Sequence, residues 1–166
     1  MPQSLPDMLA LGRKQRPGPR PEQAARRTLH RSTVALAGVP LFAGFSKRHL
    51  QRLAGATDEI RFTPGEHIVE EGNLGETLFV LLEGQVKVVR DGKLRTRLVP
   101  GDFFGEVSVL DGGPRTASVV AETPVAALRL FRRTVLELVE SEPQLALSLL
   151  EGIARRIREI DRSLHR

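Results

Sequence analysis

Residues 101–119 are the part of the sequence whose residue types and spacing best suit chemistry; they read GDFFGEVSVLDGGPRTASV. Residues 105–110 can form one or two helical turns, and the free backbone N–H groups at the start of such turns attract an anion. Arg115 stands at the start of the next predicted strand, where a guanidinium can bind a phosphate through paired hydrogen bonds. Glu106 accepts hydrogen bonds but donates none, so it suits a sugar hydroxyl. These residues predict a site for a ligand with one phosphate and a free hydroxyl group.

Short apolar runs surround this stretch between residues 58 and 131. Val, Ile, Leu, Phe and Thr recur in runs of four to seven residues, and glycine-containing turns separate most of them. The seven runs are Glu59–Phe62, His67–Glu70, Leu78–Leu82, Val86–Arg90, Leu94–Val99, Ala117–Ala121 and Val125–Phe131. Asp91-Gly92 between two of these runs is a strong signal for a tight hairpin. Seven short strands with spaced turns predict an antiparallel sandwich, barrel or jelly roll.

Helical patterns precede and follow the strands, so the expected fold class is mainly β with flanking helices. Ser46 can cap a short helix over residues 47–53 that ends at Gly55. After the strands, the pattern predicts a short helix over residues 134–140 and a long C-terminal helix that starts at Pro143.

The long helix, residues 143–165, carries apolar residues at successive spacings of 4, 3, 4, 3 and 4. They are Ala146, Leu150, Ile153, Ile157, Ile160 and Leu164. Such a heptad stripe is typical of a helix that pairs with another helix, so we expect a homodimer through residues 143–165. Burial of the stripe within the chain is the alternative, because an amphipathic helix packed on its own β-domain also needs an apolar stripe.

The positive charge is concentrated at the N-terminus. The formal net charge is +5; residues 1–33 hold seven bases and two acids, whereas residues 34–166 hold 18 of each. Five of the eleven prolines also lie in residues 1–33, so we expect a disordered basic arm there, above all over residues 1–25. Residues 34–166 then form one domain, with a β-roll at about 57–131 and C-terminal helices at 132–165. The arm either serves solubility alone or contacts nucleic acid, an anionic membrane or an acidic partner.

Composition excludes several classes of protein. Cysteine is absent, which excludes disulfides, thiolate metal sites and cysteine nucleophiles. Trp and Tyr are absent too, which argues against a nucleic-acid surface built on stacked aromatic rings. The longest weakly polar stretch, residues 34–45, is too short to span a bilayer, and no signal-peptide pattern opens the chain. We therefore expect a cytoplasmic protein without a membrane span.

The residues that could support catalysis do not form a recognisable site. His67 lies in a predicted strand beside Glu66 and Glu70, but the other three histidines fall in the N-terminal segment or in helices, so the ligand set of a metal-binding jelly roll is missing. Ser108 and Ser118 have no histidine near them in sequence, and no nucleophile elbow is present. The sequence predicts neither a metal site nor an enzyme.

Residues 101–119 resemble the phosphate-binding cassette of cyclic nucleotide-binding domains. That family's pattern is F-G-E, then small or aliphatic residues and a short spacer, then P-R-[TSA]-A-S-V. Here Phe104-Gly105-Glu106 is followed, after the spacer, by Pro114-Arg115-Thr116-Ala117-Ser118-Val119. The resemblance extends over about residues 39–165. It implies a jelly roll with a cassette helix and a long C-terminal helix, and it implies cAMP or cGMP as the ligand.

The resemblance implies a role for each residue of the motif. Arg115 would neutralise the cyclic phosphate, and Glu106 would accept a hydrogen bond from the ribose 2′-hydroxyl. Gly105 would allow close approach of the backbone, and the N–H groups of Val107 and Ala117 would assist. No metal takes part in this arrangement.

The resemblance also bears on the base. Thr116 is the position that influences base choice: its hydroxyl can meet the amine of a syn guanine, yet many bacterial members with Thr or Ser there take cAMP. We therefore favour cAMP over cGMP. The final helix would cover the base as a lid, with Arg156 as the first candidate for the covering residue and Arg155 and Ile157 as the others.

The function that follows is a stand-alone cyclic nucleotide sensor that regulates an unknown partner protein through ligand-driven movement of its C-terminal helix. Bacterial transcription regulators of the family carry a helix-turn-helix domain after that helix, whereas this sequence ends at Arg166, so no DNA-binding domain is expected. The alternative is a nucleotide-free dimeric interaction protein whose basic arm binds nucleic acid or an acidic partner. The sequence leaves open whether the chain is a whole protein or a fragment.

Overall fold

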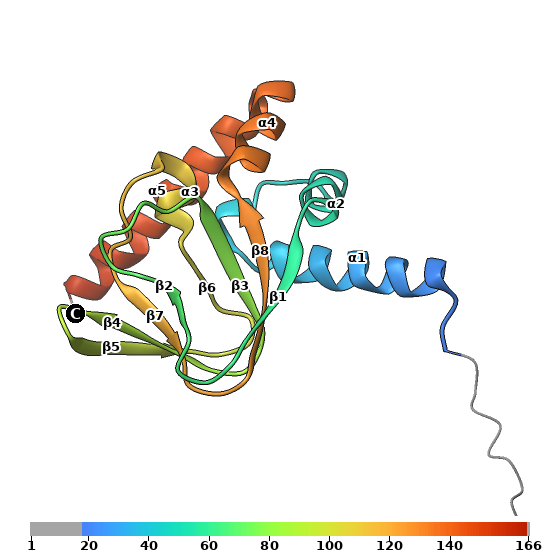
Figure 1. Ribbon diagram of the computed structural model, residues 1–166. Helices are drawn as coiled ribbons and strands as arrows, with labels where there is room; N and C mark the ends of the chain where they lie inside the picture. The colour runs from blue at the N-terminus through green and yellow to red at the C-terminus, as the bar shows by residue number, and fades with distance from the viewer. Residues whose placement is uncertain (1–17, 166) are drawn as a thin grey trace, which may run out of the picture.

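Two antiparallel four-stranded sheets form the β-roll of the computed structural model, which describes residues 18–165 except for the side chains of 156 and 160 (Figure 1). The first sheet contains, in order, β1 (Asp58–Phe62), β8 (Val125–Phe131), β3 (Thr77–Glu83) and β6 (Phe103–Phe104). The second contains, in order, β2 (His67–Val69), β7 (Ser118–Ala121), β4 (Val86–Arg90) and β5 (Lys93–Leu98). This architecture confirms the antiparallel jelly roll predicted from the sequence.

The strands follow the predicted apolar runs with one addition. All seven runs overlap observed strands, and the structure adds β6, a two-residue strand that pairs with β3. Two residues are too few to form a recognisable apolar run, so the sequence pattern did not predict β6. The predicted hairpin between β4 and β5 is present, and both of its turn residues have positive φ, +53° at Asp91 and +71° at Gly92. This backbone conformation is the one that the Asp-Gly pair favours.

Within residues 18–165, six helical segments flank the roll. They are α1 (Pro21–Ala37), the 3-10 helix η1 (Pro40–Phe42), α2 (Lys47–Gly55), α3 (Glu106–Asp111), α4 (Arg132–Ser141) and α5 (Gln144–Leu164). The predicted cap of α2 is confirmed, because the side chain of Ser46 accepts a hydrogen bond from the backbone N–H of His49 at 3.3 Å. The helices predicted at 134–140 and from Pro143 correspond to α4 and α5.

Two apolar clusters hold the fold together. One lies between the sheets and includes Phe79 and Leu81 of β3 together with Val86 and Val119 from the other sheet. The other lies between the first sheet and the helices. Its fully buried members include Leu36, Phe42, Leu53, Leu78, Leu130 and Val135. The first sheet is therefore covered on both faces, and residues of α1, η1, α2, α4 and α5 share one core with it.

The predicted disordered arm over residues 1–33 needs a correction, because α1 is a helix that begins at Pro21. Proline is tolerated in the first turn of a helix, where its missing N–H would have no partner. The C-terminal end of α1 is anchored by the buried residues Ser32, Thr33 and Leu36. Residues 18–31 are exposed, and Figure 1 shows the N-terminal half of α1 extending away from the sheets. Residues 1–17 of the predicted arm lie outside the described part of the chain.

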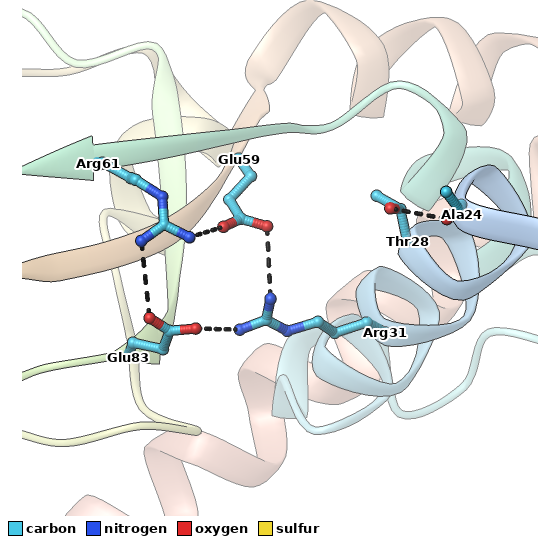
Figure 2. Close-up of polar contacts among 6 residues, drawn as sticks. All are labelled: Ala24, Thr28, Arg31, Glu59, Arg61 and Glu83. Atoms are coloured by element: carbon cyan, nitrogen blue, oxygen red, sulfur yellow. Dashed lines mark hydrogen bonds and ion pairs between the residues drawn. The ribbon is translucent and has the colours of Figure 1, made fainter. Parts of the chain in front are cut away.

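A ring of four charged side chains also joins α1 to the first sheet (Figure 2). Arg31 of α1 contacts Glu83 at 2.9 Å and Glu59 at 3.5 Å. Arg61 contacts the same two carboxylates, at 3.7 Å and 3.1 Å respectively. All four side chains are partly exposed, so solvent screens each ion pair. Each pair therefore contributes little to the free energy of unfolding. The ring therefore orients α1, whereas burial of Leu36 supplies most of its attachment.

The stripe predicted on α5 is divided between burial and exposure. Leu145 and Leu149 pack into the core cluster, with Ile153 half-buried against it. Three residues of the predicted stripe spaced seven apart remain exposed, at 61% for Leu150, 60% for Ile157 and 76% for Leu164. The side chain of Ile160 lies outside the described residues. Burial within the chain therefore accounts for Leu145 and Leu149, which flank the predicted stripe, and for part of Ile153. It leaves the edge formed by Leu150, Ile157 and Leu164 uncovered in this single chain.

Two alanine substitutions test the separate contributions of the apolar contact and the ion pairs to the attachment of α1. Leu36→Ala should lower the free energy of unfolding by about 2–5 kcal/mol, because the side chain is fully buried. Arg31→Ala should lower it by less than about 1 kcal/mol, because its ion pairs are solvent-screened. Urea unfolding of the two variants beside the unmodified chain measures both. A larger loss for Arg31→Ala than for Leu36→Ala would show that the charge ring, and not the apolar contact, attaches α1.

Candidate functional site

Backbone hydrogen bonds hold Arg115 in place, independently of the contacts of its side chain. Its N–H donates to the carbonyl of Asn73 at 2.8 Å, and its carbonyl accepts from the N–H of Gly72 at 2.9 Å. The N–H of Gly75 donates to Gly113 at 3.2 Å beside these bonds. The segment that precedes β7 is thus tied to the segment that precedes β3, and this pairing fixes where the Arg115 side chain starts.

The guanidinium of Arg115 is buried without a carboxylate partner in the described part of the chain. The residue is only 8% exposed. Nη1 donates to the carbonyl of Thr77 at 2.8 Å and Nη2 donates to the Thr77 hydroxyl at 2.6 Å, and both acceptors are neutral. Burial lowers the pKa of Arg115 below its ordinary value, although a guanidinium remains protonated at neutral pH. A buried cation without a countercharge favours the arrival of an anion.

Two glycines leave the space that the guanidinium occupies. A Cβ at Gly75 would overlap Nε of Arg115 and lie 2.6 Å from its Cζ. A Cβ at Gly105 would lie 2.6 Å from Nη1 and 2.5 Å from the carbonyl oxygen of Thr77. Gly105 also has φ of +86°, a conformation that side chains disfavour, and it directly precedes α3. Both positions therefore require glycine while Arg115 keeps this position.

A pocket of about 200 Å³ opens beside Arg115. Six of the seven residues predicted for the site line it, namely Gly105, Glu106, Val107, Arg115, Thr116 and Ala117. The carboxylate of Glu106, in the first turn of α3, and the guanidinium of Arg115 thus belong to one cavity. The pocket offers both an anion-binding group and a hydrogen-bond acceptor, which is the combination predicted from residues 101–119.

The other pocket residues were missed by sequence reasoning. They are Val69, Val88, Leu98, Phe103, Phe104, Ser108 and Val119. Most are apolar residues of strands, and nothing in their pattern separates a pocket wall from a core position. Their contribution is an apolar surface opposite the polar groups, which suits a ligand with a planar apolar part.

The comparisons with known proteins are consistent with this geometry. The model of the cyclic nucleotide-binding domain family matches residues 59–142, which include all the described residues that line the pocket. This chain belongs to the cyclic nucleotide-binding domain family. It is 36% identical over 134 residues to the cyclic AMP receptor protein of Thermus thermophilus, covering 78% of this chain and 62% of that protein. The chain spans about 60% of the length of the first curated relatives that it matches.

Solved structures of similar fold include the N-terminal domain of a transcriptional regulator from Streptomyces coelicolor A3(2). The identity is 32%, the TM-score is 0.66, and the match covers 75% of this chain and 90% of that one. Another is the regulatory subunit of a cAMP-independent protein kinase A from Trypanosoma brucei. Its identity is 28% and its TM-score 0.65, and the match covers 81% of this chain and 47% of that one.

Of the three residues predicted as a lid of this cyclic nucleotide-binding domain, the two with described side chains, Arg155 and Ile157, do not line the pocket. All described lining residues lie between positions 69 and 119, so α5 contributes none of them. Arg156 belongs to α5, but its side chain lies outside the described residues. Arg155 and Ile157 are exposed. The role of α5 as a lid therefore stays a prediction.

A second polar cluster joins α2 to the junction of α4 and α5. The side chain of Glu142 contacts Nε2 of His49 and, at 2.9 Å, Nη1 of Arg52. The hydrogen bond with His49 lowers the pKa of Glu142 below its ordinary value. The positive charges of Arg52 and Arg48 act in the same direction. This cluster fixes the point at which the C-terminal helices leave the body of the domain.

Among residues 18–165, no helix is long and apolar enough to cross a membrane. Within the same range, no group of three or more His, Asp or Glu side chains is arranged to hold a metal ion.

The lowered pKa of Glu142 predicts a pH-dependent contribution to stability. A carboxylate whose pKa is lower in the folded chain stabilises it above the unfolded-state pKa, and this stabilisation is lost as pH falls through the folded-state pKa. Glu142→Gln should therefore lower the urea midpoint at about pH 7, and its difference from the unmodified chain should shrink as pH falls below about 4.5. Unfolding curves across this range measure the effect. A difference that stays constant with pH would contradict an ionised Glu142.

Proposed function

We propose that this chain is a sensor that binds a cyclic nucleotide, with cAMP favoured over cGMP, and regulates a partner protein through movement of α5. The observation that carries the proposal is the buried guanidinium of Arg115, which lacks a carboxylate partner among the described residues and shares a pocket with Glu106. An anionic ligand supplies the countercharge. Family membership and the similarity to a cyclic AMP receptor protein support a cyclic nucleotide as that ligand.

The lining of the pocket fits each part of such a ligand. Arg115 binds the cyclic phosphate, and its low-dielectric surroundings strengthen the attraction. Glu106 accepts a hydrogen bond from the ribose 2′-hydroxyl. The N–H groups of Val107 and Ala117 assist at the phosphate, and Gly105 lets the backbone approach. The purine rests against the apolar side chains contributed by β4, β5 and β7.

Thr116 is the pocket residue on which the choice between adenine and guanine depends in this proposal. Thr116 lines the pocket and is exposed, so its hydroxyl is available to a base. The similarity to a cyclic AMP receptor protein supports cAMP. A cAMP-independent kinase regulatory subunit shares this fold at a TM-score of 0.65, so the choice of ligand depends on the pocket residues and not on the fold alone.

Movement of α5 is coupled to the pocket through α3 and α4. Arg132, the first residue of α4, lies against the end of α3 with Nη2 3.5 Å from the carbonyl of Leu110. A ligand that draws α3 toward Arg115 alters this contact, and α4 passes the change to α5 across Glu142 and Pro143. A ligand-driven change in the position of α5 requires that the ligand bind the conformation with α5 displaced more tightly than the ligand-free conformation.

The uncovered edge of α5 supports a homodimer as part of the function. Leu150, Ile157 and Leu164 repeat at intervals of seven residues and are all exposed. A spacing of seven is the repeat that two helices need to pack along their lengths, so a second copy of α5 is the matching surface.

A second candidate function is binding of nucleic acid or another polyanion by the N-terminal segment. Arg20, Arg26 and Arg27 of the described residues are exposed and make no ion pair there. Such binding weakens steeply with salt and shows little sequence preference. The absence of that salt dependence, or of any binding to duplex DNA or RNA, would dismiss this candidate without affecting the sensor.

The nucleotide proposal is tested by calorimetric titration of the chain with cAMP and with cGMP, beside Arg115→Ala. We expect binding of cAMP, and weaker binding of cGMP, by the unmodified chain. Loss of one partner of a buried charge pair costs about 2–5 kcal/mol, so Arg115→Ala should bind roughly thirtyfold more weakly or worse.

Arg90→Ala is the matched control, because Arg90 is an exposed arginine of β4 that does not line the pocket. It should bind like the unmodified chain. Circular dichroism confirms that each variant is folded. Absence of binding by the folded, unmodified chain to either nucleotide would contradict the proposed function, and an equal loss in both variants would contradict the role of Arg115.

The dimer is tested by Leu150→Glu and Ile157→Glu, which place charge on the exposed edge of α5. We expect the unmodified chain to elute as a dimer and both variants as monomers in size-exclusion chromatography with light scattering. Arg155→Glu is the matched control, because it introduces the same residue on the polar face of the helix. A monomeric unmodified chain, or variants that remain dimeric, would contradict this interface.

A further inference from the structure

Thr77, the first residue of β3, supplies both acceptors that hold the guanidinium of Arg115. Its carbonyl accepts from Nη1 at 2.8 Å and its hydroxyl accepts from Nη2 at 2.6 Å. The two bonds grip the two terminal nitrogens from the same residue, so together they fix the rotation of the guanidinium about its own axis as well as its position. Among the described residues, the Thr77 hydroxyl is the single side-chain group that hydrogen-bonds Arg115.

The donors left over determine what Arg115 can offer a ligand. A guanidinium has five N–H donors in a planar fork, and two of them are used by Thr77. Three donors remain, one on each nitrogen, and their directions follow from the two that are fixed. Because both acceptors on Thr77 are neutral, the residue orients the guanidinium and leaves its positive charge unpaired for an anion.

Thr77 is itself held firmly enough to act as a reference point. It pairs with Phe131 of β8 in the first sheet. The chain just before it is tied to the chain just before Arg115 by the hydrogen bond from the N–H of Arg115 to Asn73. Gly75 and Gly105 border the guanidinium closely, so the side chain has little room to turn. The hydroxyl is thus held at a fixed place from which it can orient the guanidinium.

We infer that Thr77 is the positioning residue for Arg115, and that its hydroxyl sets the orientation in which the guanidinium meets the phosphate. This inference rests on the proposed nucleotide site, and it assigns to Thr77 a role that residues 101–119 alone do not contain. Thr77 acts on the ligand through Arg115. Its effect must therefore disappear when the guanidinium is absent, and it must survive in any side chain that keeps the hydroxyl.

The test is a double-mutant cycle on the full chain, with cAMP affinity measured by calorimetry. Thr77→Val keeps the size and β-branching of the side chain and removes the acceptor, and should weaken cAMP binding about tenfold, as expected for a hydrogen bond to a charged group. Thr77→Ser keeps the hydroxyl and should stay within about twofold of the unmodified chain. In the Arg115→Ala background, adding Thr77→Val should change the residual affinity by less than about twofold.

Thr63→Val is the matched control, because it also removes a threonine hydroxyl from a charged partner, Glu66, outside the pocket. It should bind cAMP normally. Normal binding by Thr77→Val would overturn the inference, and so would an undiminished tenfold loss in the Arg115→Ala background, which would mean that Thr77 acts on the fold or on the nucleotide directly. Failure of the unmodified chain to bind any cyclic nucleotide would instead overturn the proposed function, and this inference with it.

Discussion

The buried, positively charged guanidinium of Arg115 is the constraint on which the site depends. Moving a charge out of water costs free energy. Here the guanidinium is compensated by two hydrogen bonds to neutral oxygens of Thr77, and no carboxylate among the described residues pairs with it. The neighbouring positions are restricted as a result, because Gly75 and Gly105 stand where a Cβ would overlap the side chain. The same burial that makes the charge costly makes it effective, because attraction to an anion is stronger where water is excluded.

The polar half of the site was predictable because its residues contrast with their surroundings. Glu106 and Arg115 interrupt a series of apolar strands, and glycines mark the turn between them. The apolar half was not predictable, because Val88 and Leu98 have the alternation of ordinary strand residues whether they face a core or a cavity. The role of Thr77 was not predictable for a related reason. A single threonine at the start of an apolar run is what any strand can show, and its importance depends on a partner 38 residues away.

Features of the fold that depend on neighbouring residues were predictable, whereas those that depend on contacts with distant segments were not. The Asp91-Gly92 hairpin and the Ser46 cap depend on neighbours in sequence, and both are observed. The disordered arm predicted over residues 1–33 overlaps α1, because proline content alone does not distinguish a proline in a flexible segment from one in the first turn of a helix. Pro21 opens a helix, where proline is tolerated, and Leu36 at the other end anchors that helix in a core assembled from distant strands. No local pattern records that anchorage.

The difference in attachment between the sheets and α5 supports the part of the proposed function that assigns the movement to α5 and not to the roll. The strands are joined along their lengths by ladders of backbone hydrogen bonds, and opening them would expose the apolar cluster between the sheets. α5 is anchored mainly at its first half, through Leu145, Leu149 and the half-buried Ile153, whereas described side chains beyond position 153 are exposed. Elements with few buried contacts open at the lowest cost in free energy. In the proposed mechanism, a small displacement of α3 against Arg132 shifts α5 and the α3 side of the pocket, while the strand walls and the hydrogen bonds between Thr77 and Arg115 stay unchanged.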